Sequence, residues 1–107
     1  MAKYMIKGSY SQQGIQGIVK EGGTERVKAI SSMLENLGGS LETMYFSFGS
    51  DDVYVTADIP DNTTAAAIAA AVGSAGTLSS YETVVLLTPS EVDAATQIAA
   101  NYRPPGA

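Results

Sequence analysis

Residues 44–59 read Met-Tyr-Phe-Ser-Phe-Gly-Ser-Asp-Asp-Val-Tyr-Val-Thr-Ala-Asp-Ile, and this stretch is the densest aromatic and β-branched region of the chain. Apolar and mixed positions alternate before and after residues 49–51, as they do in a hairpin whose strands have one buried face. We therefore predict a strand over Leu41–Phe48, a turn at 49–51 and a strand over Asp52–Ile59. The side chains expected on the buried face are Phe46, Phe48, Val53, Val55 and Ala57.

The segment before the hairpin predicts a strand and two helices. Residues 3–10 alternate in the manner of a first strand. Ser11 is placed to cap a short helix, and Thr24, which follows the break at 21–23, is placed to cap a longer one. The longer helix is expected to end at Gly38 and Gly39, and its apolar positions at helical spacing are Val27, Ile30, Met33, Leu34 and Leu37.

The segment after the hairpin predicts a helix, a strand and a last helix. Asp61 or Asn62 can cap a helix over Thr63–Val72, and a fourth strand is expected over Tyr81–Leu87. Residues 88–91, Thr-Pro-Ser-Glu, combine a capping box with proline at the first helical position, which predicts the start of a final helix. The apolar positions of that helix are Val92, Ala95, Ile98 and Ala99.

The order strand, helix, strand, strand, helix, strand is that of a split βαβ fold, which is an α+β arrangement with two helices on one face of an antiparallel sheet. The last helix is an addition to it. At 107 residues the chain is expected to form one domain over residues 1–107. The second face of the sheet would carry Tyr45, Ser47, Tyr54, Thr56 and Asp58, with either Val84 and Leu86 or the alternate set Thr83, Val85 and Leu87.

The mixture of tyrosines, hydroxyls and aliphatic side chains on that second face suits a partner sheet or a ligand cavity between two sheets. We therefore expect the chain to associate with itself, as a symmetric homodimer with its sheets packed face to face or as a larger homo-oligomer.

Composition excludes several classes of function. Six Lys and Arg stand against eleven Asp and Glu, and the net charge of −5 with no basic run argues against a nucleic-acid partner. No apolar run is long enough for a signal peptide or a membrane span, so we expect no membrane partner and a cytoplasmic protein. The chain has no cysteine and no histidine, which leaves carboxylates, lysines, tyrosines and hydroxyls for any chemistry.

Short motifs in a shared order give the chain a resemblance to a known family. They are Gly-Ser-Tyr at 8–10, Glu-Gly-Gly at 21–23, Phe-Gly at 48–49 leading into Asp52-Val53, Leu-Leu-Thr-Pro at 86–89 and Tyr-Arg-Pro at 102–104. In these residues the chain resembles the GYD domain family, small bacterial proteins related to the dimeric α/β-barrel superfamily. The resemblance implies a ferredoxin-like fold that pairs into a dimeric α/β barrel. Asp52 matches the family's Asp, while Asp51 stands where the family has Tyr.

Related barrels include cofactor-free monooxygenases, isomerases and dehydratases, and fold alone transfers none of these activities. Two functions remain open. One is a small-molecule-binding or assembly module, and the other is a cofactor-independent monooxygenase or isomerase that acts on a small aromatic or enol-type substrate. No cofactor is expected in either case.

Three tyrosines and two aspartates are the candidate ligand-binding residues. Tyr10, Tyr45 and Tyr54 could line a cavity for a small apolar or aromatic ligand, although packing in a core or interface also explains them. Asp51 and Asp52 could form a proton-moving carboxylate pair at the cavity mouth, although Asp is also a common turn residue.

Two further sets of charged residues bear on anion and metal binding. Lys20 and Arg26 beside the 21–23 break offer an anion-binding corner, although flexible glycines also explain the break. No metal site is expected, since Asp51, Asp52 and Asp58 lack the spacing of a calcium loop.

Overall fold

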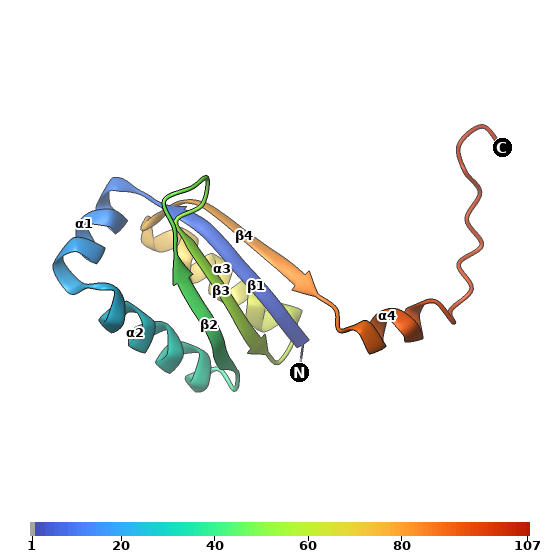
Figure 1. Cartoon of the computed structure of the whole chain (residues 1–107), viewed down its shortest axis with the longest axis horizontal. Helices are drawn as coiled ribbons and strands as arrows, with labels where there is room; N and C mark the ends of the chain where they lie inside the picture. Colours follow the sequence, from blue (N-terminus) through green and yellow to red (C-terminus); the bar gives the residue numbers. More distant parts are fainter. Residues whose placement is uncertain (1) are drawn as a thin grey trace.

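The computed structural model describes residues 2–107 and has the predicted α+β architecture, with four strands and four helices. The sheet is antiparallel throughout, and its strand order is β2-β3-β1-β4, as in ferredoxin-like folds. Figure 1 shows the helices α2 and α3 along the sheet and the last helix, α4, well away from it. The elements are β1 (Ala2–Tyr10), α1 (Gln12–Glu21), α2 (Gly23–Asn36), β2 (Ser40–Phe46), β3 (Val53–Ile59), α3 (Asn62–Ala75), β4 (Leu78–Leu86) and α4 (Pro89–Ala95).

The core lies between one face of the sheet and the helices α2 and α3. The alternation in β3 is confirmed, because its residues 53, 55, 57 and 59 are buried and those between them are only partly so. Leu34 of α2 and Ile68 of α3 pack against this face, and the buried Tyr4 of β1 donates a hydrogen bond from its hydroxyl to Asn62 at the start of α3. We call this the helix face of the sheet and the opposite side the open face.

The connection from β1 to β2 contains two helices joined at Gly22. Ser11 caps α1 as predicted, since its hydroxyl accepts a hydrogen bond from the Gly14 N–H at 3.1 Å. The prediction that Thr24 caps the second helix is wrong. Gly22 is the residue at that position, and its φ of 87° makes a sharp corner that glycine adopts at little cost.

Several predicted ends differ from the structure. Strand β2 ends at Phe46 because the Ser47 N–H donates to the Asp52 carbonyl oxygen and closes the hairpin, so Phe48 lies in the turn and is fully exposed instead of facing the helices. Strand β4 begins at Leu78, earlier than predicted, because Ser79 and Ser80 hydrogen-bond to the backbone of Ser9.

The final helix, α4, has the predicted capping box, in which the Thr88 hydroxyl accepts from the Glu91 N–H and the Glu91 carboxylate accepts from the Thr88 N–H. It is shorter than predicted, because it ends at Ala95 and leaves Ile98 and Ala99 outside. None of the helices in residues 2–107 is both long and apolar enough to cross a bilayer.

Candidate functional site

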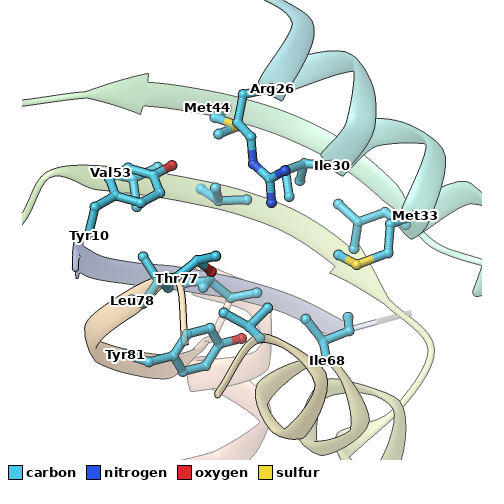
Figure 2. A pocket seen from close by; sticks show the side chains of 14 residues that line it. Tyr10, Arg26, Ile30, Met33, Met44, Val53, Ile68, Thr77, Leu78 and Tyr81 are labelled. Atoms are coloured by element: carbon cyan, nitrogen blue, oxygen red, sulfur yellow. The ribbon is translucent and has the colours of Figure 1, made fainter. Parts of the chain in front are cut away.

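A small cavity lies between the helix face of the sheet and the helices that cover it. Its volume is about 60 Å³, several times the ~10–15 Å³ that one water needs. Figure 2 shows side chains from the sheet and from α2 and α3 around it. Most of the lining is apolar, and the 14 lining residues are Ile6, Tyr10, Arg26, Ile30, Met33, Leu34, Met44, Val53, Val55, Ile68, Val72, Thr77, Leu78 and Tyr81.

Tyr10 and Arg26 bring polar groups to one side of this cavity. Tyr10 is the last residue of β1, and Arg26 is in the first turn of α2. Burial raises the pKa of the Tyr10 hydroxyl, and the positive charge of the neighbouring Arg26 opposes that rise. At neutral pH the site therefore presents a neutral phenol beside a guanidinium ion.

Tyr81 of β4 contributes a buried hydroxyl without a hydrogen-bond partner in residues 2–107. Burial raises its pKa; the nearby Thr83 hydroxyl opposes this effect, although its position does not satisfy hydrogen-bond geometry. A buried polar group without a partner costs about 1–3 kcal/mol. In Figure 2 Tyr81 and Arg26 stand on opposite sides of the cavity, so a molecule between them could be held from both.

The end of the cavity near Tyr10 is shaped by the close approach of α1 to residue 77. A Cβ atom on Gly14 would lie only 2.1 Å from the Thr77 carbonyl oxygen, so a glycine is needed there. The Ser11 N–H donates to the same oxygen at 2.9 Å. This contact fixes α1 beside an outer groove of about 300 Å³ that shares Tyr10, Arg26 and Thr77 with the inner cavity.

The structure separates the three predicted tyrosines. Tyr10 lines the cavity on the helix face, whereas Tyr45 and Tyr54 form a cross-strand pair on the open face. Tyr45 is 69% exposed. Only Tyr10 of the three therefore belongs to the cavity.

The two predicted aspartates hold the hairpin in place. Asp52 accepts a hydrogen bond from the Tyr10 N–H at 2.9 Å, and its own N–H donates to the Gly8 carbonyl oxygen at 2.8 Å. Asp51 lies 3.7 Å from the Lys7 ammonium group on the open face. Asp52 thus ties the turn to the residue that lines the cavity, while Asp51 belongs to an ion pair on the other side of the sheet.

The sequence does not single out Tyr81, and it places Arg26 only in an anion-binding corner at the start of a helix. Tyr81 lies opposite Gly8 in the β1–β4 register, and this places it on the helix face. Alternation along the strand groups residues 81, 83 and 85 on one face. Which face of the sheet this is follows only when the register with β1 is known. No Asp or Glu lines the cavity, and no three acidic side chains in residues 2–107 gather as metal ligands.

Fold and cavity together define a ferredoxin-like α+β protein with a small, mostly apolar chamber under its helices. A family model, the GYD domain, matches residues 4–96. The chain belongs to the GYD domain family, as its short motifs predicted. Searches of curated proteins and of solved structures gave no significant match.

Proposed function

We propose that this GYD-domain protein binds a small, mainly apolar molecule in the cavity between the sheet and the helices. The observation that carries the proposal is the apolar chamber with the unpartnered Tyr81 hydroxyl at its wall. Ligand pockets commonly combine apolar walls with a few polar groups that orient the ligand. A bound molecule with a polar atom near Tyr81 would relieve the cost of the unpaired hydroxyl.

Binding is favoured over the alternative, a cofactor-independent monooxygenase or isomerase. Such an enzyme would need a base that can reach the substrate, and without histidine this would be a carboxylate, a lysine or a tyrosine. No lysine lines the cavity, and burial raises the pKa of both Tyr10 and Tyr81, which makes them poor bases at neutral pH. The Asp52 carboxylate already accepts a hydrogen bond from the Tyr10 backbone, and the cavity lining contains no acidic residue. We therefore assign Asp52 a positioning role for the turn and for Tyr10.

The test is native mass spectrometry of protein purified without denaturation. Val72 lines the cavity from α3, and Val72→Phe should fill much of the space. Val19→Phe makes the same change on an exposed part of α1. We expect wild-type protein and Val19→Phe to retain the same small molecule, and Val72→Phe to lose at least about 90% of it, since overfilling a site excludes its ligand. Equal retention by both variants would place the ligand elsewhere.

We also propose that the chain forms a homodimer through the open face of the sheet, with the sheets stacked as in a dimeric α/β barrel. Two rows that contain Lys3 and Lys7 flank a central row in which Met5 lies beside Val84 and Thr56. Lys3 pairs with Glu42 at 2.7 Å and Asp58 at 3.0 Å in one row, and Lys7 pairs with Glu82 at 3.3 Å in another. The remaining positions carry the partly buried or exposed side chains Met5, Tyr45, Tyr54, Val84 and Leu86.

Such a pattern suits an interface whose apolar centre is bordered by polar groups. Lys3 and Lys7 are each held by two carboxylates, so both cations would stay paired when a second sheet covers the face, while the excess carboxylate charge would have to lie at the solvated border of the interface.

A second feature that supports self-association is the C-terminal arm, which we define as residues 87–107. Every residue of the arm is exposed, and Figure 1 shows it extending from the end of β4 away from the sheet. Its exposed apolar side chains are Leu87, Val92, Ile98 and Tyr102. A short helix gains most of its stability from packing, so a well-capped α4 that is fully exposed within residues 2–107 suits packing on a second copy.

Light scattering at micromolar concentration should therefore give at least twice the chain mass of 11.1 kDa. A clean monomer under these conditions would contradict the assembly proposal and leave the ligand proposal standing.

A further inference from the structure

We infer that the ligand of the inner cavity is a small monocarboxylate with an apolar body, and that Arg26 binds its carboxylate group. This inference rests on the proposed binding function. It follows from the surroundings of one cation, and it assigns that cation a partner of defined chemistry.

Arg26 is a partly buried cation that pairs with no carboxylate within 4.0 Å in residues 2–107. The acidic residue of the same helical turn, Glu25, is already 3.3 Å from Lys28 on the solvent side. Glu21 lines the outer groove with Arg26 but lies beyond ion-pair distance. The helix dipole does not account for Arg26 either, because the start of a helix disfavours positive charge.

The cavity supplies the remaining requirements for an anionic ligand. Its walls near Arg26 are apolar, and Figure 2 shows Ile30 and Met44 beside the Arg26 side chain. A charge-assisted hydrogen bond is stronger in such surroundings than in water. No acidic side chain lines the cavity, although the negative charges of Asp52 and Glu21 are near enough to raise the pKa of Tyr10. An anion there would therefore depend on the positive charge of Arg26.

Size and charge favour a carboxylate over a phosphate. A guanidinium group matches the two oxygens of a carboxylate in a planar, bidentate arrangement. The cavity of about 60 Å³ has a single cationic side chain, and the chain as a whole carries a net charge of −5, which disfavours a dianion. The apolar lining would hold a short branched aliphatic group, whereas an aromatic ring, which needs about 150 Å³, would extend into the outer groove that shares Tyr10 and Arg26 with the cavity.

The experiment compares charged and neutral probes of the same shape. Calorimetric titrations would use benzoate against benzamide and isovalerate against isovaleramide, with phenyl phosphate as the dianionic alternative. We expect wild-type protein to bind each carboxylate at least about tenfold more tightly than its amide. Arg26→Gln should remove this preference and leave amide binding within about twofold of wild type.

Lys28→Gln is the matched control, because it removes one positive charge from the same helix at an exposed position. It should keep the full preference for carboxylates. Arg26→Lys, which keeps the charge but loses the planar fork, should retain only part of it. Circular dichroism on each variant would verify the fold.

The outcomes separate this inference from the proposal on which it rests. Equal binding of acid and amide, or a preference that persists in Arg26→Gln, would overturn the role of Arg26 and leave apolar binding intact. Tighter, Arg26-dependent binding of phenyl phosphate would overturn the choice of a carboxylate. If none of the probes binds to wild-type protein at millimolar concentration, the proposed function itself fails.

Discussion

Two glycines of α1 differ sharply in what a side chain would meet there. A Cβ on Gly14 would collide with the Thr77 carbonyl oxygen at 2.1 Å, whereas a Cβ on Gly17 would meet nothing within 4 Å. We predict that Gly14→Ala lowers the free energy of unfolding by about 1–3 kcal/mol, because backbone must move. Gly17→Ala should raise it by roughly 0.5–1 kcal/mol, because alanine is the better helix former. Urea denaturation of both variants measures the difference, and a tolerated Gly14→Ala would contradict the tight contact.

Side-chain alternation predicted which residues of one strand share a face of the sheet. It could not show which face that is relative to the other strands, because this depends on the register. The pattern in β3 placed Val53 and Tyr54 on opposite faces, as the structure confirms. The sequence predicts one cavity for Tyr10 and Tyr54, yet the β1–β3 register pairs Tyr54 with Lys7, so Tyr10 lies on the other face. Arg26 belongs to a helix, and nothing in its sequence neighbourhood shows that it reaches the sheet.

At the level of elements, the start of α3 should make the stability of the protein depend on pH. Asp61 caps this helix, and the Thr64 N–H, followed by the Thr64 hydroxyl, lowers the pKa of its carboxyl group. A carboxyl group with a lowered pKa in the folded state stabilises the fold above its unfolded pKa, and this contribution is lost as the pH falls through the folded value.

We therefore predict that Asp61→Asn, which keeps an acceptor at the cap but does not titrate, shows a smaller loss of stability on acidification below about pH 4 than wild type. Denaturation curves at neutral and acid pH test this. Part of the acid sensitivity should remain, because Glu42 and Glu91 also have a lowered pKa. The same loss in wild type and variant would show that the cap does not contribute.

Elements marked by local chemistry were the most predictable ones. The capping box at Thr88 and the Ser11 cap are set by residues a few positions apart, and both are confirmed. Element ends were less predictable because they depend on distant partners. The start of β4 contains Ser79 and Ser80, which look like a loop until their hydrogen bonds to Ser9 are known. The end of α4 had no such partner in residues 2–107, and the helix stops a turn before its apolar pattern does.

At the level of the whole molecule, the chain is more extended than its length requires. Its radius of gyration is 16.8 Å, against about 13 Å for a compact domain of this size. The excess reflects the C-terminal arm, which Figure 1 shows projecting from the body. An exposed apolar arm and an exposed mixed sheet face on one chain are both accounted for if a second copy covers them.

This assembly predicts opposite effects for two neighbouring residues of β4. Val84 lies opposite Met5 in the register and faces the open side, whereas Val85 lies opposite Tyr4 on the helix face and is 56% exposed. We expect Val84→Glu to weaken the dimer about 100-fold or more, since it would bury a charge without a partner. Val85→Glu adds the same charge at the neighbouring position and should leave the dimer intact.

Val92→Glu, on the arm, should weaken the dimer by a smaller factor, because α4 lies outside the stacked sheets. Sedimentation equilibrium measures all three dissociation constants. If Val84→Glu and Val85→Glu associate equally well, the open face is not the contact surface, and a loss confined to Val92→Glu would assign the contact to the arm alone.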